Sequence, residues 1–147
     1  MATAEQMKLV FRLGEVSFSL PVDHLVEVRQ GSAGWLDRAR QDSANHRLGS
    51  IAQREGQLDV YDLGEILQLP PWSGHGEMTL LVLTGLRGAW ATPVDEITGI
   101  FANDTFVPLM VSPLLVHVSR LPGLAFELWQ DQVLVCGDAG RWERMLG

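Results

Sequence analysis

The most constraining feature of the sequence is an internal repeat. The tripeptide Pro-Val-Asp occupies residues 21–23 and returns at residues 93–95, an offset of 72 in a chain of 147 residues. The same offset pairs further apolar positions on both sides of the tripeptide: Leu9 with Leu81, Val10 with Val82, Leu25 with Ile97, and Val28 with Ile100. A period of half the chain predicts two similar small units, because a solenoid requires at least three copies.

Length and charge narrow the class of protein. Units of about 70 residues are marginal alone, so we expect one domain over residues 7–146, with halves at residues 7–69 and 79–146. The formal net charge is -7 and the pI is about 4.9. Nucleic-acid binding requires clustered basic side chains, and the only lysine is Lys8. The sequence therefore predicts no nucleic-acid partner.

The cysteine count and the hydropathy of the sequence indicate the cellular compartment of the protein. Cys136 is the only cysteine, which excludes an internal disulfide, and its position in an apolar run predicts an inert core thiol. No apolar run reaches 18 residues, and the first residues lack the pattern of a signal peptide. We therefore expect a cytoplasmic protein without membrane insertion.

Alternating apolar and polar residues predict strands throughout the chain. In the first half they cover residues 7–13, 16–20 and 25–29, with a hairpin turn at Gly14. The prolines of the two Pro-Val-Asp copies are expected to end their strands, because proline lacks an N–H donor. Further strands are expected at residues 49–54, 57–61, 79–84, 89–92, 97–101, 125–129 and 132–136.

Helices and loops complete the pattern. Asp62 and Asp138 stand where each would cap a short helix, and a third short helix is expected after Ser112. Residues 31–47 are polar and aperiodic, which predicts a long loop with one helical turn. Trp35 within it is expected to pack over the core, and a partner anchor is the alternative. Residues 107–113 are predicted to form a second, proline-rich loop.

The search for catalytic chemistry fails. Four histidines without ligand spacing and one cysteine build no zinc site, and no phosphate-binding glycine loop is present. Asp23 and Asp95 are interpreted as local Asx turns, and His24 as part of a solvated face. We predict no catalytic residue, no metal and no cofactor.

With this layout, the sequence resembles the CheW-like coupling family of bacterial chemotaxis. Residues 21–28 (Pro-Val-Asp-His-Leu-Val-Glu-Val) fit the family segment Pro-Val-x-x-Val-x-Glu-Val. Residues 49–55 stand at the family's Gly-Val-Ile-Asn-Leu-Arg-Gly motif, and residues 58–63 at the strand that follows it. Residues 93–97 match a second family signature. The motif at residues 49–55 keeps its arginine, Arg54, but departs from the family elsewhere.

The resemblance implies an all-β fold with short helices, in which two intertwined five-stranded SH3-like barrels are related by pseudo-symmetry. It also implies a non-catalytic adaptor that couples a methyl-accepting chemoreceptor to a histidine kinase with a CheW-like regulatory domain. By position, Glu27, Val28 and Arg29 correspond to a strand associated with kinase contacts. Arg54 corresponds to the arginine associated with receptor binding, and Glu55 stands beside it.

Alternatives to each assignment stay open. Val28 could be a core residue, and Arg54 could be a turn arginine that binds nearby carbonyls. Ala52 and Gln53 replace the asparagine and leucine of the family motif, so a divergent module with another partner in motility or surface signalling is a second hypothesis. A third class, an enzyme or ligand-binding barrel, predicts a convergent polar pocket.

Overall fold

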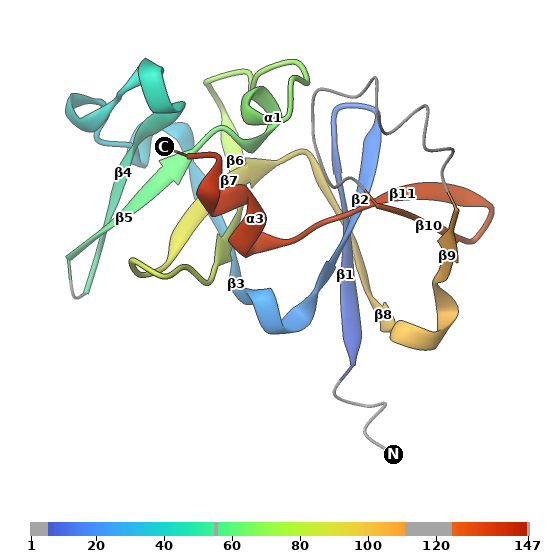
Figure 1. Ribbon diagram of the computed structural model, residues 1–147. Coiled ribbons are helices and arrows are strands. Elements are labelled where there is room, and N and C mark those ends of the chain that lie inside the picture. Colours follow the sequence, from blue (N-terminus) through green and yellow to red (C-terminus); the bar gives the residue numbers. More distant parts are fainter. Residues whose placement is uncertain (1–5, 55, 111–124, 147) are drawn as a thin grey trace.

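Strands make up most of the computed structural model, which describes residues 6–54, 56–110 and 125–146 (Figure 1). The strands of this part are β1 (Met7–Leu13), β2 (Val16–Pro21), β3 (Leu25–Ser32), β4 (Arg47–Gln53), β5 (Gly56–Tyr61), β6 (Glu77–Leu83), β7 (Trp90–Val94), β8 (Glu96–Ala102), β9 (Val107–Leu109), β10 (Phe126–Trp129) and β11 (Gln132–Cys136). The α-helices are α1 (Leu63–Ile66) and α3 (Ala139–Arg144), and 3₁₀ turns occupy Val22–His24, Ala33–Trp35, Arg38–Arg40, Ser43–Asn45 and Asn103–Thr105. The predicted all-β class with short helices is confirmed.

The two sheets exchange strands between the halves of the chain. One sheet has five strands in the order β3-β6-β7-β5-β4, and the other has six in the order β8-β1-β2-β11-β10-β9. The first half therefore supplies β1 and β2 to the six-stranded sheet, while the second half supplies β6 and β7 to the five-stranded sheet. Figure 1 shows the five-stranded sheet on the left and the six-stranded sheet on the right. This exchange is the predicted intertwining.

The internal repeat extends to the register of the strands. Lys8 on β1 pairs with Pro21 on β2, and Leu80 on β6 pairs with Pro93 on β7, so both partners move by 72 residues. In the hairpins near the end of each half the offset is 76, because Ser50 pairs with Asp59 as Phe126 pairs with Val135. Strands β1, β2, β3, β4 and β5 thus correspond to β6, β7, β8, β10 and β11.

Even an irregularity in the sheets is repeated. The β3–β6 ladder skips Val26, and the β1–β8 ladder skips Thr98, which lies 72 residues later. A β-bulge bends a strand and increases its twist locally. Since both copies bulge at the same place, the two halves share the path of the backbone as well as the order of strands. The pseudo-symmetry predicted from residues 21–23 and 93–95 is therefore seen at single-residue resolution.

The apolar side chains form three cores, and strand alternation explains the division. On β1, Leu9 and Phe11 face a central core, while Val10 faces a smaller core inside the six-stranded sheet. On β6, Leu81 likewise faces the central core, and Leu80 faces a core inside the five-stranded sheet. The central core also takes apolar residues from β2, β7, α1 and α3. It is the layer that fixes the two sheets together.

Aromatic rings give the central core its rigidity. The rings of Phe11 and Phe18 stack with centroids 5.2 Å apart, and Trp142 on α3 meets both edge-on at 6.3 and 6.1 Å. Each such ring pair adds about 1 kcal/mol beyond the area that it buries. Trp142 is only 4% exposed, so α3 is anchored on β1 and β2 by one large side chain.

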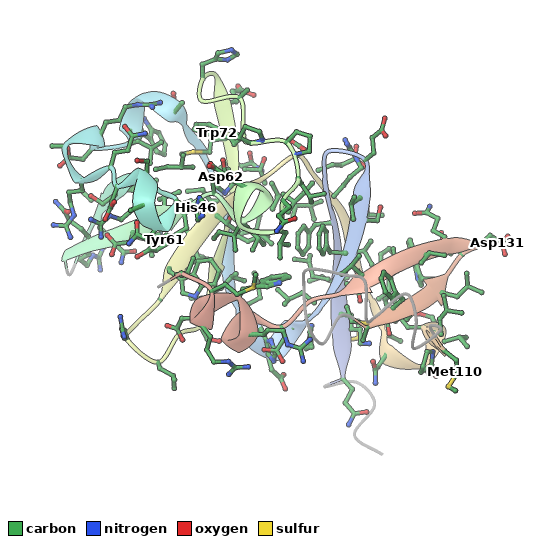
Figure 2. All side chains as sticks on the ribbon, turned by 45° about the horizontal axis from the view of Figure 1, so that its top comes forward. His46, Tyr61, Asp62, Trp72, Met110 and Asp131 are labelled. Atoms are coloured by element: carbon green, nitrogen blue, oxygen red, sulfur yellow. The ribbon has the colours of Figure 1, made fainter. Side chains whose placement is uncertain are left out.

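Two aspartates begin the two helices, as predicted. The Asp62 carboxylate accepts from the Glu65 N–H at 3.1 Å, and the Asp138 carboxylate accepts from the Arg141 N–H at 3.0 Å. These bonds satisfy donors that have no partner inside the helix. Asp62 also accepts from the Trp72 N–H at 3.0 Å, and Figure 2 shows Asp62 below Trp72.

The strand-ending role predicted for the prolines is confirmed at Pro21, which is the last residue of β2. At Pro93 it is wrong, because β7 continues to Val94. Strand β5 pairs with β7 only at Ala91, so a missing donor two residues further on breaks no hydrogen bond on that side. Pro21 lies at the end of its strand, where proline is tolerated for the same reason.

The segment at residues 31–47 has more structure than expected. Strand β3 continues to Ser32, and three short 3₁₀ turns follow where one helical turn was predicted. Trp35 is 58% exposed and does not cover the core, whereas the neighbouring Leu36 is buried. Gly31 explains the position of the Trp35 ring, since a Cβ there would lie 3.0 Å from it.

In the second half, the predicted loop at residues 107–113 contains strand β9, which alternation over three residues could not reveal. The helix predicted after Ser112 lies outside the described residues. The strands predicted at residues 125–129 and 132–136 are confirmed as a hairpin, and its turn residues Gln130 and Asp131 both have positive φ values, 49° and 62°. Such turns match the twist of the flanking strands.

Candidate partner-binding surface

The outer side of β3 is a free sheet edge. Strand β3 ends the order of the five-stranded sheet, and within the described ranges no strand pairs with its outer side. An unpaired edge presents backbone donors and acceptors to any approaching chain. Three of the predicted contact residues, Glu27, Val28 and Arg29, lie on this edge strand.

The side chains of β3 offer two different faces to a partner. Glu27 and Arg29 lie two residues apart on one face and form an ion pair, with Nε and Oε1 3.2 Å apart. Val28 points to the other face and is 39% exposed, so the core alternative for this residue is wrong. Val26, which sits in the bulge, is 52% exposed. The edge therefore combines exposed aliphatic groups with a charged pair that solvent screens.

Arg54 lies in a different place. It follows the last residue of β4, in the turn to β5, and is exposed. In the described part of the chain it makes no hydrogen bond or ion pair, so the predicted bonds to nearby carbonyls are not observed there. Glu55 lies outside the described residues.

The predicted contact residues do not form one site. Strands β3 and β4 occupy opposite ends of the five-stranded sheet. The outer side of β4 is moreover covered, since the backbone of Asp37 bridges to Ser50, with Asp37 N 2.7 Å from Ser50 O. The structure therefore separates a β3 surface, defined as Val26, Glu27, Val28 and Arg29, from the Arg54 turn.

Sequence reasoning missed a second sheet edge. Among the described strands, β8 ends the six-stranded sheet, and it carries Ile100, which is 47% exposed. Ile100 is the counterpart of Val28 at the offset of 72. Val28 lies on β3, which pairs with β6, and Ile100 lies on β8, which pairs with β1. The signal was present in the repeat, because Val28 and Ile100 were already paired at this offset.

The polar residues that an enzyme hypothesis would use have structural roles. The Asp95 carboxylate accepts from the Gly14 N–H, so it links β8 to the β1–β2 turn and makes no local Asx turn. His24 Nδ1 accepts from the Ala139 N–H at 3.1 Å, at the start of α3, and its interpretation as a solvated position is wrong. Neither residue lines the cavities of about 510 and 670 Å³ that the described residues form.

Cys136 is half-buried near the end of β11. Burial raises the pKa of its thiol, and the nearby Glu127 carboxylate raises it further. A thiol with a raised pKa is a poor nucleophile at neutral pH, because the thiolate is the reactive form. The structure thus agrees with an inert side chain.

The family comparison decides what this fold is. The model of the CheW-like domain matches residues 8–106, which is more than half of the chain. The chain belongs to the CheW-like family. This family consists of non-catalytic scaffolds, and its fold class matches the two intertwined sheets described above.

A solved structure extends the likeness over nearly the whole CheW-like chain. The scaffolding protein TtCheW from Thermoanaerobacter tengcongensis superposes with a TM-score of 0.70 and 14% sequence identity, over 94% of this chain and 92% of that one. At this identity the match concerns the fold. A search of curated protein sequences finds no match. No helix in the described ranges is long and apolar enough to span a membrane.

Proposed function

We propose that this CheW-like protein is a cytoplasmic adaptor that couples a methyl-accepting chemoreceptor to a histidine kinase with a CheW-like regulatory domain. Family membership supports the proposal, as does the fold shared with TtCheW, a scaffolding protein. We take residues 7–146 as one functional domain, because each sheet contains strands from both halves. The observation that carries the proposal is the free β3 edge with its exposed aliphatic and charged side chains.

In this proposal the two separated surfaces bind two partners. The β3 surface docks on the kinase regulatory domain, whose own edge strand would meet aliphatic groups and the Glu27–Arg29 pair. Arg54 contacts the receptor tip through its exposed guanidinium. Because the surfaces lie at opposite ends of one sheet, both partners can be bound at the same time.

The first experiment tests the β3 surface. Binding of the purified kinase regulatory domain is measured by titration calorimetry for the wild type and for Val28→Lys. A lysine on the docking edge should weaken binding at least tenfold, which corresponds to about 1.4 kcal/mol. Val133→Lys is the matched control, because Val133 is a 59% exposed valine on β11. Equal loss in both variants, or loss in neither, contradicts the assignment.

The second experiment tests Arg54 with a receptor fragment. Arg54→Gln should reduce capture of the receptor tip several-fold and leave the kinase domain bound, since the turn lies away from β3. Arg38→Gln removes another exposed arginine as a control. If the receptor still binds the Arg54→Gln variant normally, this residue is not the contact.

A specific observation keeps the alternative function in view. Ala52 and Gln53, which replace the asparagine and leucine of the family motif, are both exposed beside Arg54. A changed surface at this position favours a divergent module with a different partner in motility or surface signalling. Affinity purification from native cells separates the two, because only coupling predicts a receptor and a kinase among the captured proteins.

A further inference from the structure

A polar cavity of about 670 Å³ lies where α3 meets the five-stranded sheet, on surfaces not used above. Its walls come from β4, β5, the β6–β7 turn, the start of β7 and the end of α3. Six residues carry its chemistry: Arg47, Asp59, Arg87, Trp90, Glu143 and Arg144. The volume is within the range of pockets that bind small molecules.

Because the two halves are pseudo-symmetric, this cavity can be compared with one at the equivalent place on the other sheet. An equivalent cavity of about 510 Å³ lies at the six-stranded sheet, and its Phe18 corresponds to Trp90 at the offset of 72. There Val135 stands for Asp59, and Leu67 stands for Glu143 at the offset of 76. Arginines line both hollows, since Arg141 and Arg144 stand at the smaller one and Arg144 belongs to both. At the matched positions compared here, only the larger cavity carries charges, so Asp59 and Glu143 are a property of this site and not a requirement of the architecture.

Two guanidinium groups of the polar cavity have no partner among the residues that the structure describes. The Glu143 carboxylate is already bound, since it accepts from the Leu86 N–H at 2.9 Å. Asp59 lies 3.8 Å from Arg40, outside the cavity. Arg87 and Arg144 make no hydrogen bond or ion pair in the described residues, although they stand on different walls. Unpaired arginines that converge on a hollow are suited to carboxylate or phosphate groups.

The aromatic wall provides a second, independent signal. Trp90 is 3% exposed, and its Nε1 donor is buried without an acceptor in the described part of the chain. A Cβ on Gly85 would lie 3.0 Å from the ring carbon beside this nitrogen and still closer to a carboxylate oxygen of Glu143, so this edge of the indole faces both the β6–β7 turn and Glu143. A buried donor without a partner is costly and usually marks a missing acceptor.

We propose that this cavity binds a small organic anion. Arg87 and Arg144 would hold its carboxylate or phosphate from two sides, and an acceptor atom of the ligand would meet the Trp90 N–H. A chain of net charge -7 repels anions in general, whereas this cavity sets three arginines against the two carboxylates of Asp59 and Glu143. Arg47 already donates to the Arg40 carbonyl at 2.6 Å, so the ligand is held by Arg87 and Arg144. The bound anion would join α3 to the β6–β7 turn and stabilise the fold.

The test is titration calorimetry of the intact protein with citrate and, separately, with ATP, which present carboxylates and phosphates. Saturable binding of either probe at one site is expected, and which probe binds identifies the acidic group. At 100 times the dissociation constant the melting temperature should rise by about 9 °C. Arg87→Gln and Arg144→Gln should each weaken binding about tenfold. Trp90→Phe keeps the ring, removes the N–H and should weaken binding several-fold.

Arg54→Gln is the matched control, because it removes the same charge outside the cavity and should leave anion binding unchanged. Circular dichroism of each variant shows whether the fold is intact. No binding of either probe overturns the proposal, as does equal binding by the Arg87→Gln and Arg144→Gln double variant. The proposal is also overturned if a protein partner covers Arg144 while neither citrate nor ATP binds. None of these outcomes affects the β3 surface.

Discussion

The interiors of the two sheets differ although their backbones are equivalent. Four matched positions are polar in the six-stranded sheet and aliphatic in the five-stranded sheet: Lys8 for Leu80, Ser19 for Ala91, Glu127 for Ile51, and Cys136 for Val60. The five-stranded interior is a plain apolar core. The six-stranded interior instead contains a buried ion pair. The comparison shows that the architecture does not depend on one core composition.

The polar interior is fully paired. Lys8 Nζ lies 2.9 and 2.8 Å from the two oxygens of Glu127, and the Ser19 hydroxyl donates to the same carboxylate. Lys8 also lies 5.1 Å from the centroid of the Phe106 ring, which faces the cation. Glu127 is only 3% exposed, so its charge depends on these partners. An ion pair of this kind contributes little net stability but penalises wrong pairings.

This difference has a consequence for a duplicated fold. If the β4–β5 hairpin took the place of β10–β11, Ile51 would stand opposite Lys8 and leave its charge unpaired. The correct hairpin supplies Glu127. The polar cluster therefore distinguishes between two hairpins of similar shape, as buried polar residues distinguish registers in other folds.

The largest expected effect follows from breaking the pair. Glu127→Ala leaves the ammonium of Lys8 without its carboxylate and should lower the free energy of unfolding by about 3 kcal/mol. Urea denaturation followed by tryptophan fluorescence measures this value. A loss below about 1 kcal/mol would show that solvent already reaches the pair.

Replacing the polar interior of the six-stranded sheet by aliphatic side chains should not lower the free energy of unfolding. The triple variant Lys8→Leu, Ser19→Ala and Glu127→Ile copies the aliphatic side chains of the five-stranded sheet. We expect unchanged stability or a gain of about 1–3 kcal/mol, because no charge is then desolvated. More chains should misfold by pairing the wrong hairpin, which would give a larger aggregated fraction after dilution from urea. A loss of several kcal/mol contradicts the comparison.

The helix caps predict a smaller effect with a clear pH signature. Backbone hydrogen bonding, first from the Arg141 N–H, lowers the pKa of Asp138 below its ordinary value of 3.8. Burial raises the pKa of Asp62 above the same value. The stability that Asp138 supplies is thus present above pH 3.8 and is lost as the pH falls. For Asp62 the pH dependence of stability is reversed. Because the pKa of its carboxyl is higher in the folded protein than in the unfolded chain, the folded state loses stability as the pH rises.

Asp138→Asn and Asp62→Asn test this contrast. The stability difference between wild type and Asp138→Asn should increase by a few tenths to 1 kcal/mol as the pH rises from about 2 to 5. The corresponding difference for Asp62→Asn should decrease over the same interval and above it. Thermal denaturation at several pH values measures both. Parallel slopes would contradict the assigned pKa directions.

The smallest effect concerns a reaction rate. Since the pKa of the Cys136 thiol is raised, its reaction with a disulfide reagent at pH 7 should be at least tenfold slower in the folded protein than in urea. Absorbance of the released chromophore follows the reaction. Equal rates in both conditions would show an accessible, ordinary thiol.

Much of this fold could be predicted from the sequence, because the repeat and the caps are local signals. The 72-residue offset anticipated the equivalent ladders, and Asp62 and Asp138 anticipated both helices. The exchange of strands between sheets came only from the family resemblance, since alternation defines a face but not a neighbour. The Asp95–Gly14 bond and the Lys8–Glu127 pair were missed because they join residues 81 and 119 positions apart.

The predicted contact residues show the same limit. Alternation predicted a strand that includes Glu27, Val28 and Arg29, and the structure places all three on β3. Their separation from Arg54 depends on the order of strands in the sheet, which no local pattern contains. The free edge of β8 followed from the repeat only after β3 was known to be an edge.

Amide hydrogen exchange on the free protein and on its complex with the kinase regulatory domain tests the adaptor account most directly. The account predicts that protection on complex formation concentrates in β3, at the amides of Val26, Glu27, Val28 and Arg29. The amides of the buried strand β6 should change little, because they are already paired. A complex that leaves β3 exchange unchanged and protects another surface, or the absence of any complex, would contradict it.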